Sequence, residues 1–217
     1  MSISQYIKKY EKSSIKSDKK DFEKLLWNNE RQMKCKFEMA EKVIDFSTVS
    51  SWLDIGCGTG DFFEYVLAKH DVSVVVGLDV TPEFLKISSE KNKKHHVKHI
   101  CENIFTFSTD KTYDLITLSG IIQMCNEEEI VSIFSSLSGL LNIGGQVWLD
   151  TLNIDSTRWK GINENKRNKL CRFFDANELI EFLKNEKFNS IESNVFTYDL
   201  KIDKTNKAEL LYAYAIK

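Results

Sequence analysis

A short glycine-rich stretch constrains the fold of this chain most strongly. The sequence SWLDIGCGTGDFFEYV, residues 51–66, places Gly56, Gly58 and Gly60 at alternate positions directly after an apolar run. The apolar run before the glycines predicts a strand, the glycines predict a turn, and the residues after them predict the start of a helix. Glycines let a ligand lie against the backbone, and a helix N-terminus offers it free amides. The stretch therefore predicts a strand–turn–helix unit that binds a ligand at its turn.

Short apolar runs and amphipathic helical patterns alternate through the rest of the chain. This alternation is typical of parallel strands joined by crossover helices. We expect strands over residues 51–55, 74–79, 97–101, 113–119 and 145–151. We expect helices over residues 60–69, 82–91 and 127–142, and a further helix that begins after Asp175. Two closing apolar segments, 190–200 and 208–217, are separated by a short polar connector, which predicts an antiparallel pair.

The first fifty residues follow another pattern. Met33, Phe37, Ala40 and Ile44 recur at three- and four-residue steps, which predicts a helix that leads into the first strand. No repeat, linker or low-complexity tract interrupts the chain. We therefore expect one domain over residues 1–217, in which 1–48 form a helical N-terminal extension or lid and 49–217 form the core.

Charge and cysteine content narrow the function classes. The chain has 30 basic and 32 acidic residues, a formal net charge of -2, and only four arginines, which argues against a nucleic-acid partner. Its five cysteines are odd in number and scattered, which is typical of reduced thiols. The N-terminus lacks the apolar core of a signal peptide, and no apolar run reaches membrane-spanning length. We expect a cytoplasmic protein with no membrane partner and leave its oligomeric state open.

The spacing of the glycines also separates ligand classes. A dinucleotide fingerprint requires Gly-x-Gly-x-x-Gly, and Asp61 stands where its last glycine would fall. The stretch LDIGCGTG instead resembles the first motif of the class I S-adenosylmethionine-dependent methyltransferases. This resemblance covers residues 51–145 closely and the later element order more loosely. It implies a Rossmann-like, doubly wound α/β fold with a seven-stranded sheet, mostly parallel, and one antiparallel strand near its edge. The implied cofactor is S-adenosyl-L-methionine, with S-adenosyl-L-homocysteine as its product.

The resemblance also implies a set of cofactor-binding residues. Asp79 follows the second strand about 20 residues after the glycines, where an acidic side chain can accept hydrogen bonds from ribose hydroxyls. Asn103 stands where the family usually has Asp, and its side-chain oxygen can still accept from the adenine amine. Arg31 is a candidate partner for the cofactor carboxylate, and a solvated helix charge is the alternative. The complete set comprises Arg31, Asp54, Gly56, Cys57, Gly58, Gly60, Asp79, Val80, Glu102, Asn103, Ile104, Leu118 and Ser119.

An acceptor pocket is expected beyond the fourth and fifth strands, at the topological switch point. Asp150 is the candidate general base, because it is the one obvious carboxylate after these strands; a strand-end hydrogen-bond acceptor is the alternative. The candidate substrate-binding residues are Tyr6, Tyr10, Trp27, Gln123, Met124, Asn153, Arg158 and Trp159. His95, His96 and His99 lack a carboxylate or cysteine cluster beside them, so no metal is expected.

These patterns predict an enzyme that methylates a small molecule at oxygen or nitrogen. Methyl transfer from a sulfonium is an in-line displacement, for which the protein supplies orientation and desolvation. Two alternatives stay open: a protein or peptide methyltransferase, and a non-catalytic S-adenosylmethionine-binding domain with a regulatory or assembly role. An aminopropyl transferase would need acidic residues after the fourth strand to hold a polyamine, and the sequence does not supply that set.

Overall fold

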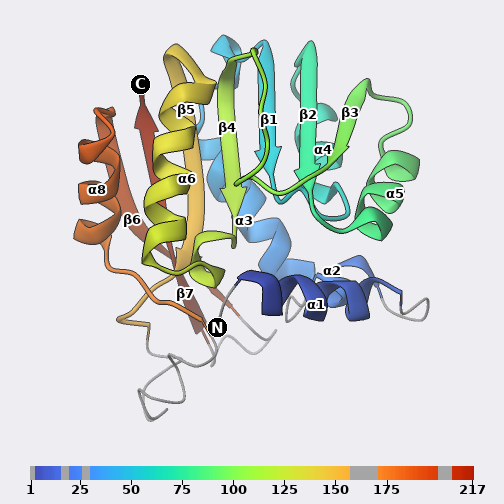
Figure 1. The fold of residues 1–217 in the computed structure, drawn as a ribbon, viewed down its shortest axis with the longest axis horizontal. Helices are drawn as coiled ribbons and strands as arrows, with labels where there is room; N and C mark the ends of the chain where they lie inside the picture. Colours follow the sequence, from blue (N-terminus) through green and yellow to red (C-terminus); the bar gives the residue numbers. More distant parts are fainter. Residues whose placement is uncertain (1–2, 16–19, 26–29, 157–170, 200–206) are drawn as a thin grey trace.

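Seven strands form a single sheet in the order β3-β2-β1-β4-β5-β7-β6 (Figure 1). The computed structural model describes residues 3–15, 20–25, 30–156, 171–199 and 207–217. The strands are β1 (Ser51–Ile55), β2 (Val74–Asp79), β3 (Val97–Cys101), β4 (Tyr113–Ser119), β5 (Leu141–Leu152), β6 (Asn189–Asp199) and β7 (Lys207–Ile216). Neighbouring strands from β3 to β5 pair in parallel, whereas β7 pairs antiparallel with both β5 and β6. The predicted fold, with one reversed strand next to the edge, is confirmed.

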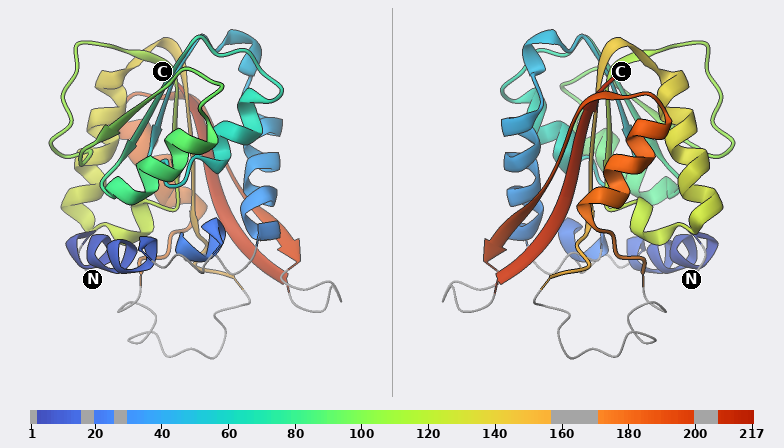
Figure 2. Two further views of the ribbon diagram at one scale, coloured as in Figure 1. Left: turned by 90° about the vertical axis from the view of Figure 1, so that its right-hand side faces the viewer. Right: turned by 90° about the vertical axis from the view of Figure 1, so that its left-hand side faces the viewer.

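Helices cover both faces of the sheet and one of its ends (Figure 2). The helices α3 (Glu30–Val43) and α4 (Asp61–Leu67) pack on one face, and α6 (Glu127–Leu140) and α8 (Ala176–Asn185) pack on the other. Helix α5 (Pro82–Lys91) connects β2 to β3, and two 3-10 helices span Phe46–Thr48 and Ile122–Met124. Helices α1 (Ile3–Ser14) and α2 (Asp21–Lys24) lie across the carboxyl ends of the parallel strands. The N-terminal extension is therefore helical, as predicted.

Local sequence signals set where the long helices begin. The Asn126 side chain accepts a hydrogen bond from the Glu129 amide at 2.9 Å, and the Glu129 carboxylate accepts one from the Asn126 amide at 2.7 Å. This reciprocal pair is a capping box. Asp175 caps α8 through its carboxylate, which accepts from the Glu178 amide at 3.0 Å. Both helix starts agree with the sequence prediction.

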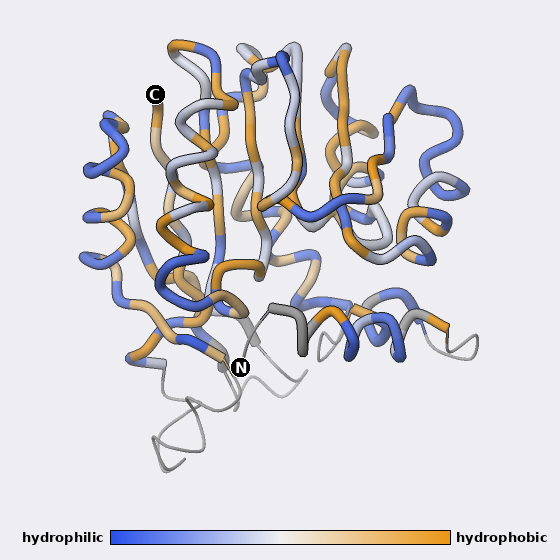
Figure 3. The backbone as a smooth tube through the Cα atoms, in the orientation of Figure 1, coloured by the Kyte–Doolittle hydropathy of each residue, from blue (hydrophilic) through white to orange (hydrophobic). Residues whose placement is uncertain are grey.

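The core consists of apolar side chains on the two sides of the sheet. On the α3 and α4 side, Trp52 is fully buried, and its ring meets Phe62 and Phe63 edge-on at centroid distances of 5.1 and 5.0 Å. Phe37 of α3 stacks on Phe62 at 4.8 Å, which fixes α3 against α4. Hydropathy follows this arrangement: the central strands are mostly hydrophobic, and the segment between α5 and β3 is hydrophilic (Figure 3).

The fifth strand begins earlier than the sequence pattern predicts. The prediction placed it at residues 145–151, but Leu141 already pairs with Tyr113, and the register then shifts before Leu115. Gly144 lies in the irregular part of the strand and has a φ of +79°, a conformation that favours glycine. Because the paired glycines look like a turn in sequence, the first part of this strand was missed. Within the described ranges, no helix combines the length and the apolar character needed to cross a bilayer.

Candidate functional site

A pocket lies beyond the carboxyl ends of β1, β2 and β4. Its floor is the glycine loop after β1, and the segment after β4 forms one side. Ile7 and Tyr10 of α1, together with Leu25 after α2, form the wall that faces the loop. Strands β1 and β4 are neighbours in the sheet but not in sequence, so the pocket lies at the switch point where ligands bind in doubly wound folds.

The glycine loop adopts a conformation that only glycine accommodates easily. Gly56, Gly58 and Gly60 have φ angles of +76°, +54° and +72°. A Cβ atom on Gly56 would lie 2.3 Å from Cδ1 of Ile121, and one on Gly60 would lie 2.1 Å from Oγ of Ser88. Both the left-handed backbone and the close contacts therefore require glycine, and the loop backbone is open to the pocket at Gly56 and Gly58.

Asp79 ends β2 beside this loop. Its Oδ2 accepts from the Gly58 amide at 2.9 Å, and its Oδ1 accepts from the Thr81 amide at 2.8 Å. Burial raises the pKa of Asp79 above the usual carboxyl value, while the Thr81 and Gly58 amides act in the opposite direction. The carboxylate is therefore fixed in direction by backbone amides at the edge of the pocket.

A second carboxyl group, Asp54, lies on β1 beneath the loop. It is 4% exposed, and its Oδ1 accepts from the Thr117 hydroxyl at 2.6 Å. The Thr117 hydroxyl in turn accepts from the indole nitrogen of Trp52 at 2.7 Å. Burial raises the pKa of Asp54 to about 7, and the nearby Asp79 and Asp150 carboxylates add to the rise. Asp54 therefore changes its charge near neutral pH.

A buried ion pair lies next to the pocket, between α3 and the ends of β4 and β5. The Lys36 ammonium pairs with Asp150, and the two side chains are each 1% exposed. The Ser119 hydroxyl accepts from Lys36 Nζ at 3.0 Å and donates to Asp150 Oδ2 at 2.7 Å. Burial lowers the pKa of Lys36, and the Asp150 carboxylate acts in the opposite direction. Ser119 lines the pocket, so its hydroxyl links the ion pair to the pocket.

The structure brings together most of the site residues predicted from the sequence. Those that line the pocket are Tyr10, Asp54, Gly56, Cys57, Gly58, Asp79, Val80, Glu102, Asn103, Ile104, Ser119, Gln123 and Met124. Asn103 also accepts from the Phe105 amide through its side-chain oxygen at 3.1 Å. Their roles toward a ligand stay predictions.

The other predicted residues lie elsewhere. Gly60 packs against Asn92, whose side-chain amide donates to the Gly60 carbonyl at 3.0 Å, and Leu118 is in the core. Arg31 is exposed on α3, and Asn153 is buried where it bridges to Phe174. Tyr6 belongs to α1. Trp27, Arg158 and Trp159 lie outside the described residues. Across the described chain, no group of three or more His, Cys, Asp or Glu side chains is placed to hold a metal ion.

Several site residues were missed by the sequence analysis. Leu25 and Ile121 lie against the glycine loop, but an isolated aliphatic residue in sequence carries no signal for this position. Lys36 was missed because a lysine on an amphipathic helix is normally exposed. Its position relative to Met33, Phe37 and Ala40 places it on the buried face of α3, and that spacing is the signal that could have revealed it.

A glycine loop and a strand-end carboxylate at the switch point of a doubly wound sheet define a Rossmann-like ligand-binding domain. Residues 53–147 match the family model of a methyltransferase domain. This match supports the assignment of the chain to the class I S-adenosylmethionine-dependent methyltransferase family, which its first motif predicted.

Curated relatives and solved structures agree with this assignment. The chain is 31% identical over 123 residues to malonyl-[acyl-carrier protein] O-methyltransferase 2 of Ilyobacter polytropus, across 54% of this chain and 47% of that protein. It is 26% identical over 184 residues to carboxy-S-adenosyl-L-methionine synthase 1 of Yersinia pseudotuberculosis, across 68% of this chain and 73% of that protein. The N-methyltransferase NodS from Bradyrhizobium japonicum, in complex with S-adenosyl-L-homocysteine, shares the fold with a TM-score of 0.73 at 18% identity, across 97% of each chain.

The matches to the two malonyl-[acyl-carrier protein] O-methyltransferases of Ilyobacter polytropus cover only part of those proteins. They span 37% and 47% of the lengths of enzymes 1 and 2. Residues 53–147, which match the family model, hold the glycine loop, most of β1 and strands β2 to β4.

Proposed function

We propose that this protein is an enzyme that binds S-adenosyl-L-methionine and transfers its methyl group to a small-molecule acceptor. The observation that carries the proposal is the pocket in which the glycine loop and the Asp79 carboxylate meet at the switch point of the sheet. The glycine loop leaves little room for Cβ atoms, and an oriented carboxylate lies next to it. This combination fits a nucleoside-bearing ligand.

Each part of the pocket has a proposed partner on the cofactor. Asp79 would accept from the ribose hydroxyls, and Asn103 and Ile104 would hold the adenine. The backbone at Gly56 and Gly58 and the end of β4 at Ser119 would hold the methionine portion. When bound, the cofactor supplies a methyl group already activated on a sulfonium, so the protein's task is to orient the acceptor and exclude water.

The remaining pocket surface is proposed to take the acceptor. Met33, Phe37 and Met124 make it apolar, and Tyr10 and Gln123 add neutral polar groups. A surface of this kind suits a small molecule that presents one oxygen or nitrogen nucleophile. The curated relatives are named for acceptors or products of different kinds, so the acceptor atom is left as oxygen or nitrogen.

Asp150 is again proposed as the base, and the Ser119 side chain offers a route for the proton. Its carboxylate is 1% exposed, and the Ser119 hydroxyl joins it to the pocket. A proton from the acceptor would pass to Ser119 Oγ while the Ser119 proton passes to Asp150. The Lys36 ammonium would pair with the Asp150 carboxylate before this step.

Calorimetric titration of the full chain with S-adenosyl-L-methionine and S-adenosyl-L-homocysteine tests the proposed function. We expect both ligands to bind the wild type. Asp79→Ala should weaken binding at least tenfold, which corresponds to about 1.4 kcal/mol, because the proposed ribose hydrogen bonds are lost. Asp110→Asn is the matched control, since Asp110 is exposed and away from the pocket. A folded wild type that binds neither ligand would refute the proposal.

A further inference from the structure

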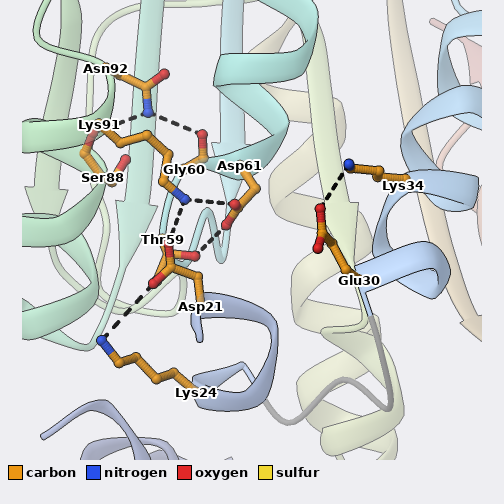
Figure 4. A network of polar contacts seen from close by, with 10 residues as sticks. All are labelled: Asp21, Lys24, Glu30, Lys34, Thr59, Gly60, Asp61, Ser88, Lys91 and Asn92. Carbon is orange, nitrogen blue, oxygen red and sulfur yellow. Dashed lines mark hydrogen bonds and ion pairs between the residues drawn. The ribbon is translucent and has the colours of Figure 1, made fainter. Parts of the chain in front are cut away.

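A lysine at the end of α5 connects the N-terminal wall of the pocket to the glycine loop. Lys91 Nζ lies 2.8 Å from Asp21 Oδ2 and 2.6 Å from Asp61 Oδ1 (Figure 4). Asp21 is the first residue of α2, and Asp61 is the first residue of α4, directly after the glycine loop. One ammonium group therefore joins three segments that are far apart in sequence.

The three charged groups are shielded from water more than an ordinary surface pair. The side chains of Lys91 and Asp61 are each 15% exposed, and that of Asp21 is 31% exposed. Burial lowers the pKa of Lys91, but the Asp61 and Asp21 carboxylates more than offset this effect, and the pKa is raised overall. Lys91 therefore stays charged at neutral pH. An ion pair in this setting is screened by salt less than an exposed one.

The segment that Lys91 holds is also in contact with the loop. Leu25 follows α2, and its Cδ2 atom would lie 2.7 Å from a Cβ built on Gly58. Leu25, Tyr10 and Gly58 all line the pocket. The Tyr10 ring meets Phe84 of α5 edge-on at 6.2 Å, so α5 supports this wall at a second point. A ligand that rests on Gly58 is therefore enclosed by a wall whose seating depends on α5.

We propose that Lys91 is a positioning residue that seats this wall on the glycine loop and so sets how long the cofactor stays bound. The proposal rests on the proposed function, because it concerns the cofactor of the same pocket. Lys91 also separates two like charges: without it, the Asp21 and Asp61 carboxylates would repel each other across the wall. Loss of Lys91 should therefore loosen the wall more than loss of the Asp21 charge alone.

The release of labelled S-adenosyl-L-homocysteine from the full chain, chased with excess unlabelled ligand, tests this proposal. We expect Lys91→Met to release the ligand about tenfold faster than the wild type, equivalent to about 1.4 kcal/mol. Asp21→Asn should give a smaller increase, and Lys91→Arg should restore a rate close to that of the wild type. Lys34→Met is the matched control, because Lys34 forms an ion pair with Glu30 on the same side of the molecule but is 59% exposed (Figure 4).

The dependence of the release rate on ionic strength tests the electrostatic role of Lys91, because a role in packing alone would not depend on salt. Higher ionic strength should speed release from the wild type and from Lys91→Arg, because salt weakens the ion pairs. It should not speed release from Lys91→Met, in which salt screens the repulsion between the Asp21 and Asp61 carboxylates. Equal release rates in the wild type and Lys91→Met would overturn the proposal, as would equal acceleration in Lys34→Met. If Lys91→Met does not fold, unchanged release in Asp21→Asn overturns it instead. A wild type that binds no ligand at all would mean that the proposed function itself is wrong.

Discussion

The surroundings of Asp54 shift its protonation strongly. A carboxyl group on a buried strand, 4% exposed and near two other carboxylates, is costly to ionise. The Thr117 hydroxyl compensates in part, because it donates to the carboxylate at 2.6 Å. The pKa of about 7 in the folded chain is well above the ordinary value of 3.8. Such a difference between the folded and unfolded states makes stability depend on pH.

The predicted sign follows from that raised pKa. Between pH 4 and pH 7 the folded state holds a proton on Asp54 that the unfolded state has released, so this group's contribution to stability is lost as pH rises through 7. We expect Asp54→Asn, which keeps an acceptor for Thr117, to gain stability over the wild type as pH rises from 4 to 8, by up to about 4 kcal/mol. Urea unfolding of both proteins across that pH range measures the difference. A difference that stays constant with pH would contradict the prediction.

At the scale of elements, the ion pair between Lys36 and Asp150 ties α3 to the end of β5 across the pocket edge. Removing one member of a buried pair leaves the other charge without compensation, which typically costs about 3–5 kcal/mol. We expect Lys36→Met to lower the free energy of unfolding by that amount in urea denaturation. Lys34→Met, on the exposed side of the same helix, should leave it essentially unchanged.

A double substitution tests whether the charge or the packing of Lys36 accounts for the predicted loss of stability. Lys36→Met together with Asp150→Leu removes both buried charges, so most of the lost stability should return. If the double variant is as unstable as Lys36→Met alone, the side-chain packing of Lys36, and not its charge, holds α3 in place.

The elements were easier to predict than the contacts between them. The strands from β1 to β4 follow directly from apolar runs bounded by turn residues, and the caps at Asn126 and Asp175 define two helix starts. The glycine loop and Asp79 were recognisable because their spacing along the chain is local. Lys36, Leu25 and Lys91 were not, because each acts through a partner that is distant in sequence. The spacing of Lys36 along α3 indicates its buried face but not its partner Asp150, and Leu25 and Lys91 leave no periodic signal.

At the scale of the whole molecule, the pocket joins the N-terminal helices to the sheet, so ligand binding should stabilise the entire chain. A ligand that binds only the folded state at a concentration of 100 times its Kd adds about 2.7 kcal/mol of stability. For a chain of 217 residues we expect S-adenosyl-L-homocysteine to raise the Tm by about 5–10 °C. Thermal denaturation with and without the ligand measures this shift. Asp79→Ala, with binding at least tenfold weaker, should show about half of this shift or less at the same ligand concentration. An equal shift in both proteins would place the ligand elsewhere.

The raised pKa of Asp54 has a consequence for the net charge of the pocket during a catalytic cycle. Under the proposed function, S-adenosyl-L-methionine brings a positive sulfonium, and the thioether that remains after methyl transfer is neutral. The Asp54 carboxyl group, with a pKa of about 7, would change its ionisation in step with the cofactor. Its ionised form is favoured beside the cation, and its neutral form is favoured after the cation is gone. Asp54 would then take up a proton when the product forms and release it when fresh cofactor enters. Once the acceptor's proton has left Asp150 for solvent, a proton on Asp54 would stand in for the charge that left with the methyl group, and the pocket would return to the same net charge.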